Sequence, residues 1–269
     1  TSLNISAGNI VYVPLRGKKT LALVTSSERL EESKGDVKNM NFNLKKVTED
    51  MGSSIFRQEF LETIFDTSTY FAQNSNESLS CVKPHIFIEE YTKISKIKIN
   101  LSEKKIESKL DNEHKLTSEK LLLQYPIEDR ISIYKTLVRE SFARGKSVFM
   151  VLPTESDIEK FHTELSKGIE QFTFALHSGI SPKKNISAYE KIITSTHPVL
   201  IIATAYYLSI PRMDIGTIIL EHENSTSFRM IPRPHFDLRV FAEVFASKIN
   251  AKFILADEIL RFETIGRMD

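Results

Sequence analysis

The sequence has very little of what crosslinks a chain or anchors it in a membrane. Its 269 residues include one cysteine, Cys81, and no tryptophan. A single cysteine excludes an internal disulfide and a cysteine-rich zinc site. No apolar run approaches the ~20 residues that cross a bilayer, and no charged-then-apolar leader is visible. These absences predict a cytoplasmic protein in a reducing compartment, without a membrane partner.

The charge of the chain is almost balanced. Lys and Arg number 36 against 35 Asp and Glu, which leaves a formal net charge of +1. A strongly basic chain is the simplest sign of nucleic-acid binding, and this sequence does not carry it. Any contact with DNA must therefore come from a local patch, and most lysines are expected on solvated surface.

The amino-terminal part begins with a predicted β-hairpin. Residues 9–14 and 20–25 are rich in β-branched and apolar side chains, and Arg16-Gly17-Lys18-Lys19 lies between them as a turn. Two such runs around a glycine-containing turn are typical of a hairpin. A short third strand is expected at 43–47.

A helix is predicted to follow the hairpin. Apolar residues recur at helical spacing from Ile55 to near Phe71, and Ser53 or Ser54 is the expected N-cap. Together with the hairpin, this helix predicts a small β-rich amino-terminal domain over residues 1–84.

The rest of the chain changes character twice. Residues 85–118 alternate lysines with acidic residues and are predicted to be a charged linker. From 119 to 269, short apolar runs such as 147–152 and 199–204 alternate with helical patterns. Strands alternating with helices predict an α/β domain whose parallel sheet is covered on both faces.

Several segments of this second part resemble those of the primosomal protein N′ (PriA) helicase family. LHSGIS at 176–181 looks like the family's His-Ser-Gly-Leu-Ser segment, and PVLIIAT at 198–204 is similar to the strand that ends in Gly-Thr-Arg. IGTIILEHE at 215–223 lies where the family has its DEEH box. SFR at 227–229 and PRPH at 232–235 follow in the family's order. The resemblance implies a RecA-like helicase lobe over 119–269.

The amino-terminal part resembles the domain with which that family binds the 3′ end of the leading strand at a stalled fork. VYVP at 11–14 with Gly17-Lys18-Lys19 matches the family's Val-Arg-Val-Pro hairpin and its glycine. Leu44-Lys45 matches a Leu-Lys pair. The resemblance therefore implies a DNA-end-binding domain at 1–84 and a role in replication restart.

The phosphate-binding loop of such a lobe falls at residues 124–131, where its chemistry is missing. A P-loop binds phosphates through glycine N–H groups and a lysine, and its hydroxyl holds magnesium. Here the glycines are absent, Arg130 stands in for the lysine, and Ile131 replaces the hydroxyl. Glu128 and Asp129 occupy the predicted helix start, where their carboxylates would repel a triphosphate.

The acidic box that holds magnesium and the attacking water is altered too. Glu221 takes the place of the family's aspartate, and His222 takes the place of its glutamate. With both halves of the nucleotide site changed, we expect no ATP hydrolysis and no cofactor. The chain is then a pseudo-helicase rather than an enzyme.

Other clusters favour structural interpretations. The residues that invite a metal lack the helical spacing of a zinc site; they are Glu221, His222, Glu223 and His235. His177-Ser178 carries no nucleophile elbow and is expected to be a loop. Tyr206-Tyr207 falls in a loop that touches DNA in the family, but packing within the protein is the favoured interpretation over stacking on a base.

Two groups of cations remain as candidates for DNA contact. The first belongs to the predicted hairpin and the segment after it, and the second is an arginine cluster that suits phosphate binding. The candidate DNA-binding residues are Arg16, Gly17, Lys18, Lys19, Lys45, Arg229 and Arg233. Surface salt bridging is an equally good interpretation of the arginine cluster, which also includes Arg239.

The sequence therefore predicts a non-catalytic DNA-binding or scaffold protein that binds forked or 3′-ended DNA. One alternative is a protein-interaction module that docks a replication or repair partner without DNA. A second is an ATP-dependent 3′–5′ helicase subunit that borrows a nucleotide site in trans.

Overall fold

The computed structural model describes residues 5, 8–25, 27, 45–51, 56–82, 119–230 and 234–266. The predicted linker at 85–118, the two candidate N-cap serines Ser53 and Ser54, and Arg233 lie outside the described residues.

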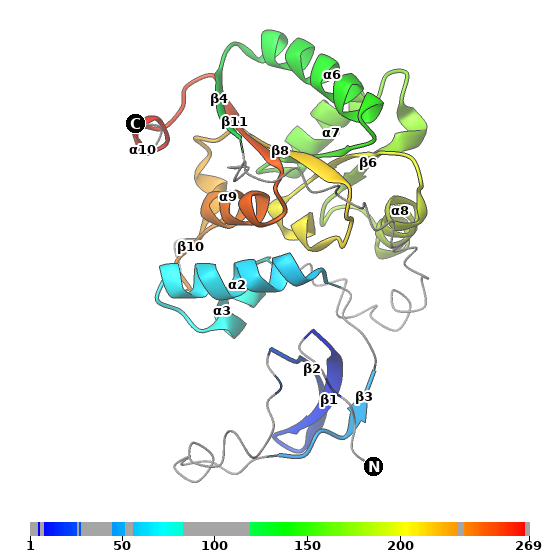
Figure 1. Cartoon of the computed structure of the whole chain (residues 1–269), viewed down its shortest axis with the longest axis vertical. Helices are drawn as coiled ribbons and strands as arrows, with labels where there is room; N and C mark the ends of the chain where they lie inside the picture. The colour runs from blue at the N-terminus through cyan, green and yellow to red at the C-terminus, as the bar shows by residue number, and fades with distance from the viewer. Residues whose placement is uncertain are drawn as a thin grey trace, which may run out of the picture.

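A six-stranded parallel sheet forms the centre of the molecule (Figure 1). Its strands lie in the order β4-β11-β8-β5-β7-β6. Their bounds are β4 Lys120–Gln124, β5 Ser147–Val151, β6 Thr173–Leu176, β7 Leu200–Ala203, β8 Ile215–Glu221 and β11 Lys252–Asp257. The predicted fold class, a parallel RecA-like α/β lobe with a small β-rich part before it, is confirmed.

Helices cover both faces of this sheet. Along β5, Val148 and Met150 pack with α6 (Ile127–Ala143) and α7 (Glu155–Leu165), whereas Phe149 and Val151 point to the opposite core. That opposite face carries α8 (Pro182–Thr194) and α9 (Leu238–Lys248). Successive residues of a strand point to opposite faces, so a sheet buried on both sides needs continuous apolar runs.

Short elements connect these layers around the sheet. They are η1 Glu170–Phe172, η2 Ala205–Ser209, η3 Thr226–Phe228, β9 Arg229–Met230, β10 Phe236–Asp237 and α10 Phe262–Ile265. β9 and β10 pair as a small antiparallel ribbon.

Glycine and proline mark two of the helix ends. Gly145 has a φ of 69° and follows Arg144, the C-cap of α6, in the left-handed position that ends a helix. α8 begins at Pro182, and proline is well accommodated in the first turn, where its missing N–H is not needed.

The amino-terminal hairpin is confirmed. β1 (Ile10–Leu15) and β2 (Lys18–Leu23) pair antiparallel around a two-residue turn. Both turn residues are left-handed, Arg16 with a φ of 50° and Gly17 with a φ of 78°, as the tightest hairpin turns require. The third strand, β3 (Glu49–Asp50), pairs with β1 later in the chain than the expected 43–47.

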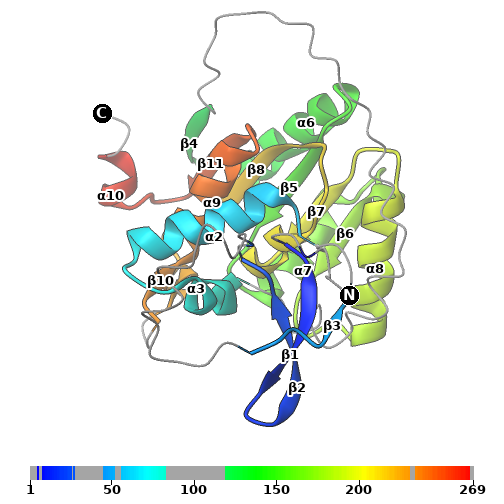
Figure 2. The ribbon, with the colours of Figure 1, turned by 60° about the horizontal axis from the view of Figure 1, so that its bottom comes forward.

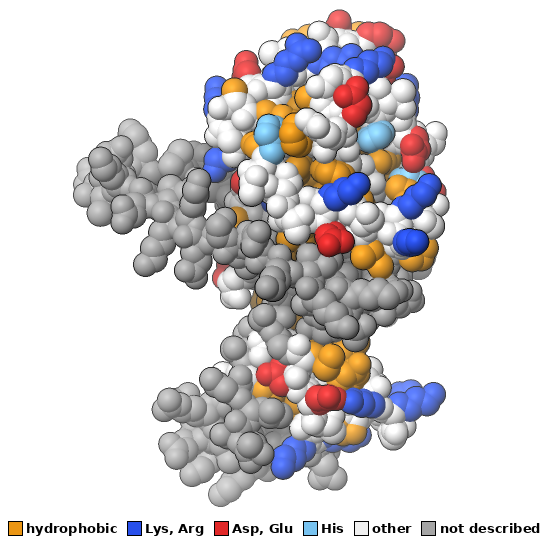
Figure 3. All heavy atoms as spheres, turned by 90° about the vertical axis from the view of Figure 1, so that its right-hand side faces the viewer, with side chains coloured by type: hydrophobic (Ala, Val, Ile, Leu, Met, Phe, Trp, Pro, Cys, Tyr) orange, Lys and Arg blue, Asp and Glu red, His pale blue; other side chains and the backbone are white. Residues whose placement is uncertain are grey.

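None of the described helices combines the length and the apolar character that crossing a bilayer requires. Charged side chains of both signs are spread over the face of the lobe seen in Figure 3.

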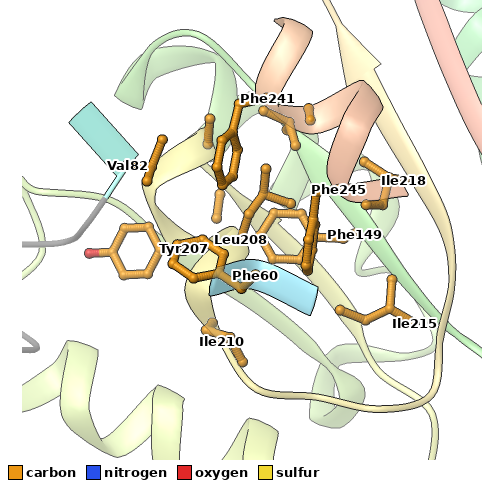
Figure 4. Packing of buried hydrophobic residues seen from close by; sticks show 14 of the residues in the cluster. Phe60, Val82, Phe149, Tyr207, Leu208, Ile210, Ile215, Ile218, Phe241 and Phe245 are labelled. Atoms are coloured by element: carbon orange, nitrogen blue, oxygen red, sulfur yellow. The ribbon is translucent and has the colours of Figure 1, made fainter. Parts of the chain in front are cut away.

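Two further helices, α2 (Gln58–Tyr70) and α3 (Ser75–Val82), pack on the α9 side of the lobe (Figure 2). Phe60 of α2 is fully buried, and its ring lies 5.4 Å from that of Phe241 and 6.0 Å from that of Phe245. Figure 4 shows Phe60 among the aliphatic and aromatic side chains of the lobe. α2 and α3 therefore share one core with the lobe.

Polar contacts reinforce this packing just before α2 and along it. Arg57, before the helix, donates to the carbonyl of Arg212 over 2.9 Å. Lys248 of α9 lies 2.8 Å from a carboxylate oxygen of Asp66. The division into domains at 1–84 and 119–269 stays a prediction.

Truncation of Phe60 tests how strongly α2 depends on the lobe. We expect Phe60→Ala to lower the free energy of unfolding by about 3–5 kcal/mol, the range for a fully buried phenylalanine. Phe65→Ala on the same helix, where the ring is 39% exposed, is the matched control and should cost much less. Urea unfolding measures both, and equal losses would show that α2 is not anchored through Phe60.

Candidate functional site

The carboxyl ends of the parallel strands bring the two predicted halves of the nucleotide site together. β11 lies between β4 and β8 and pairs with both. Its Asp257 is in register with Gln124 of β4, and its Ala256 is in register with Glu221 of β8. Ligands of open α/β sheets bind at this edge. The segment in the P-loop position and the acidic box are thus separated by one strand.

Arg130 and Glu221 form a buried ion pair at this edge. The guanidinium Nη2 lies 2.6 Å and Nε 3.0 Å from the same carboxylate oxygen of Glu221. The side chain of Arg130 is 1% exposed and that of Glu221 is 0% exposed. The arginine and the acid that the sequence analysis predicted in the lysine and magnesium positions therefore neutralise each other.

Two further hydrogen bonds complete this cluster, which we call the Arg130–Glu221 cluster. Arg130 also donates to the carbonyl of Tyr125, and the hydroxyl of Tyr134 donates to the second oxygen of Glu221. Burial and the charge of Glu221 hold the pKa of Tyr134 well above its usual value, so Tyr134 keeps its proton and remains a donor. Both carboxylate oxygens of Glu221 are thereby bound inside the protein.

The charge on Arg130 is stable despite its burial. Burial alone would lower the pKa of Arg130, but the hydrogen bond and the negative charge of Glu221 raise it above its usual value. Removing one partner of a buried pair leaves an uncompensated charge, which costs about 3–5 kcal/mol.

The other predicted residues of the nucleotide site lie outside this cluster. Glu128 and Asp129 are exposed in the first turn of α6, where carboxylates interact favourably with the helix dipole. Ile131 packs against the core between α6, α7 and the sheet. Pro126 is the N-cap and its side chain makes no capping bond.

His222 packs against α7. Its backbone is left-handed, with a φ of 56°, so the chain turns at the end of β8. The ring is 6.0 Å from that of Phe161 in an edge arrangement, and Nε2 lies 3.7 Å from Asp157. Nδ1 is 4.0 Å from Glu221.

Glu223 is held in a second buried pair that the sequence analysis did not find. Its carboxylate accepts bonds from the backbone N–H of Arg261, from Nε of Arg261 at 2.7 Å and from Thr264 at 2.5 Å. Burial raises the pKa of Glu223, but these bonds outweigh it and leave the pKa below its usual value. Glu221 and Glu223, weighed as metal ligands from the sequence, each bind an arginine. The sequence shows a second acid, Glu223, two residues after Glu221. Its arginine partner lies 38 residues further along the chain, so the sequence did not reveal the pair.

The LHSGIS segment forms a loop tied to α7. His177 Nε2 lies 2.8 Å from Glu159, and Ser178 donates to Glu155 over 2.5 Å. The hydrogen bond from Ser178, followed by the nearby His177, lowers the pKa of Glu155. Residues 177–180 belong to no helix or strand, in agreement with the loop interpretation, and the Ser178 hydroxyl bonds to a carboxylate rather than to the imidazole.

The tyrosines of η2 are packed. Tyr207 is 4% exposed, and burial raises its pKa to about 12. Tyr206 packs against the core as well. Packing within the protein, the interpretation favoured from the sequence, therefore holds for Tyr207, while Tyr206 is only partly buried.

The hairpin cations differ in whether they form ion pairs. Arg16 and Lys18 are exposed, and neither forms an ion pair with another described residue. Lys19 pairs with Glu49 and lies 4.2 Å above the ring of Tyr12. Lys45 is exposed just before β3.

The antiparallel register relates Lys45 to the hairpin turn. Tyr12 is paired with Glu49, and the strand before Glu49 runs back along β1 toward Leu15. Lys45 therefore precedes β3 on the side of the turn, in the direction of Arg16.

The two described members of the arginine cluster, Arg229 and Arg239, differ in their exposure. Arg229 is exposed on β9, where it lines a cavity of about 520 Å³ together with Tyr70 and His235. Arg239 is buried and donates hydrogen bonds to the carboxylate of Asp237 and to the carbonyls of Glu223 and Ser225. Arg239 is thus a structural residue, and Arg229 is the accessible one of the two.

Loss of one member of the Arg130–Glu221 cluster should be costly. We expect Glu221→Ala to lower the free energy of unfolding by about 3–5 kcal/mol, because Arg130 is left buried without a counter-charge. The double variant Arg130→Met with Glu221→Leu should lose less than Glu221→Ala.

The matched control is Glu164→Ala. Glu164 is a surface carboxylate 3.8 Å from Lys135 and 3.3 Å from Lys167, and its loss should cost at most about 1 kcal/mol. Chemical unfolding compares the variants, and a Glu221→Ala loss no larger than that of Glu164→Ala would contradict the buried pair.

Comparison with known proteins places this site in context. No family model matches the chain. It is similar to the replication restart protein PriA of Haemophilus influenzae, with 22% identity over 143 residues. That match covers 52% of this chain, which spans only 19% of the length of that relative.

Among solved structures, the UvsW helicase from bacteriophage T4 aligns over 93% of this chain and 90% of that one, with a TM-score of 0.35 and 12% identity. The sequence match, together with the parallel α/β fold, supports a distant helicase-like relationship.

Proposed function

We propose that this chain is a non-catalytic, helicase-derived DNA-binding scaffold whose nucleotide site has become a structural ion pair. The observation that carries the proposal is the Arg130–Glu221 cluster. An ATPase needs a free cation for the phosphates and a free acid for magnesium, and in this chain each satisfies the other.

Opening the cluster for a nucleotide would be expensive. Withdrawing Arg130 leaves the buried Glu221 unpaired, at a cost of about 3–5 kcal/mol, which corresponds to a loss of affinity of roughly two to four orders of magnitude. Pro126 offers no N–H to a phosphate, and the carboxylates of Glu128 and Asp129 stand at the helix start.

The DNA-binding part of the proposal rests on the hairpin. Arg16 and Lys18 are exposed at a turn that includes a glycine, where the backbone itself can approach a phosphate or a terminal sugar. Lys45 precedes β3 toward the same end of the small sheet as the hairpin turn. By its resemblance to the end-binding domain of the PriA family, the hairpin would bind forked or 3′-ended DNA, and the lobe would dock a replication or repair protein.

One observation favours the protein-interaction module as a second candidate. The segment after β11 exposes three large apolar side chains, with Ile259 66%, Phe262 89% and Ile265 44% exposed. Apolar groups displayed in one segment are typical of a protein contact rather than of a DNA contact.

The chain should neither bind nor hydrolyse ATP. With magnesium and a fluorescent ATP analogue, we expect no saturable signal up to about 1 mM. Binding of the nucleotide must open the Arg130–Glu221 cluster, and the cost of opening it weakens the affinity to that range. Magnesium-dependent turnover that disappears in a folded Arg130→Ala variant would contradict the proposal and favour the helicase-subunit alternative.

DNA binding should depend on the hairpin. The triple variant Lys18→Glu, Lys19→Glu, Lys45→Glu should abolish binding to forked and 3′-ended DNA in an anisotropy titration, and Arg229→Glu should weaken it less. About three phosphate contacts predict a slope near −2 to −3 when log K is plotted against log salt.

The control for this titration is the variant Lys160→Glu, Lys167→Glu, Lys191→Glu. It makes the same change in net charge at three exposed lysines of α7, its C-terminal loop and α8, and it should bind as the parent does. If the two triple variants weaken binding equally, or if the parent prefers neither forks nor 3′ ends over blunt DNA, the proposed DNA site is wrong.

A further inference from the structure

A mainly apolar cleft of about 350 Å³ lies between the hairpin and the helices α2 and α3. Its lining includes Leu21, Leu23, Leu61, Ile64, Phe65 and Leu79. Two of its apolar residues are well exposed, Leu15 at 55% and Phe65 at 39%. Among the described residues, the cleft is thus an apolar hollow beside a strand.

The outer edge of β2 borders this cleft. Every residue from 20 to 25 lines it. A strand that presented one face would contribute alternate residues, because successive side chains point to opposite faces. Six consecutive lining residues indicate that the edge of β2, and not one face alone, borders the cleft, which Ile10, Val13 and Leu15 of β1 line as well. In the described part of the chain, β2 pairs only with β1 and ends the order β2-β1-β3.

The hydrogen-bond pattern shows which backbone groups this edge offers. The carbonyls of Ile10 and Tyr12 accept bonds of 2.9 Å from Met51 and Thr48, so both residues bond on the β3 side. Backbone groups alternate in direction along a strand, so Val11 and Val13 bond on the β2 side.

This alternation sets the direction of the groups on β2. The partners of Val11 and Val13 are Ala22 and Thr20, which therefore point their N–H and C=O back to β1. Leu21 and Leu23 consequently direct theirs outward, along the open edge.

We propose that this edge is a docking site for an extended peptide segment of a partner protein, which adds to β2 as a further strand. The backbone of the peptide bonds to Leu21 and Leu23, and its apolar side chains enter the cleft against Ile64 and Phe65. Strand addition with side-chain pockets is an established mode of peptide recognition.

Positive charge at one end of the cleft indicates which charge the peptide carries there. Arg16 and Lys18 are exposed at the hairpin turn, directly beyond Leu15, and Figure 3 shows Lys and Arg side chains beside the apolar ones of the hairpin part. The peptide therefore has apolar residues at alternate positions along its length. Its acidic residues lie at the end next to the hairpin turn. This site shares Arg16 and Lys18 with the proposed DNA surface, but it requires neither DNA nor the nucleotide position and is therefore tested without DNA.

A synthetic peptide of sequence Thr-Val-Thr-Ile-Thr-Val-Asp-Asp, labelled with fluorescein at its amino terminus, tests the site in the absence of DNA. Bound antiparallel to β2, it brings its aspartates to the hairpin turn. We expect saturable binding by the full chain in the micromolar range. N-methylation of the alternate amides that face β2 should abolish binding, whereas N-methylation of the other set should not.

Matched variants locate the binding surface. Phe65→Lys should weaken binding about tenfold or more, the scale of losing one anchoring side chain. Ile133→Lys replaces an equally exposed apolar residue, 37% exposed on α6, and should leave binding unchanged. Lys18→Glu should weaken binding about two- to fivefold, and a peptide with lysines in place of its aspartates should recover that loss.

Several results would overturn the proposal. One is the absence of saturable binding, and another is equal binding by both N-methylated peptides. A third is a self-association of the chain that Phe65→Lys removes while the peptide does not bind, which would make a second copy the occupant. If Phe65→Lys fails to fold, the methylated peptides and the Lys18→Glu charge reversal still decide the question.

Discussion

Arg130 and Glu221 lie together at the carboxyl edge of the sheet with almost no exposure to solvent, and neither charge is tolerable there without the other. This pair joins the first turn of α6 to the end of β8 across the intervening strand β11. Tyr134, one turn further along α6, takes the remaining oxygen of Glu221. The constraint therefore sets the position of α6 on the sheet and occupies the place where a nucleotide would need free charges.

The opposite face of the sheet depends on aromatic packing. α9 covers that face, and α2 packs on α9 through Phe60, Phe241 and Phe245. Arg57 bonds to the lobe just before α2, and Lys248 pairs with Asp66 within it, so these polar contacts orient the helix. Because α2 and α3 belong to the lobe's core, the hairpin that precedes them is presented beside a fixed apolar surface, and the cleft along β2 is a consequence of that arrangement.

The small sheet thereby offers two different surfaces. Its turn presents Arg16 and Lys18 to solvent, which suits phosphates or acidic side chains. Its outer edge, which pairs with no other strand in the described part of the chain, lies next to apolar side chains, an arrangement that suits an extended chain. The buried charges of Arg130, Glu221 and Glu223 are paired inside the lobe, whereas Arg16 and Lys18 of the hairpin are exposed.

Much of the fold was determined by the sequence itself. The apolar runs of the buried strands, the glycine of the hairpin turn and the glycine after α6 act within a few residues, so local pattern was sufficient to place them. The assignment of Arg130, Ile131, Glu221 and His222 to a degenerate nucleotide site rests on the resemblance and stays a prediction. Only the tertiary structure decided that Arg130 bonds to Glu221, 91 residues away, and that Glu223 bonds to Arg261. It also placed α2 on α9 and the third strand at Glu49–Asp50. These outcomes depend on the order of strands in the sheet, which brings distant residues together, and local periodicity carries no information about that order.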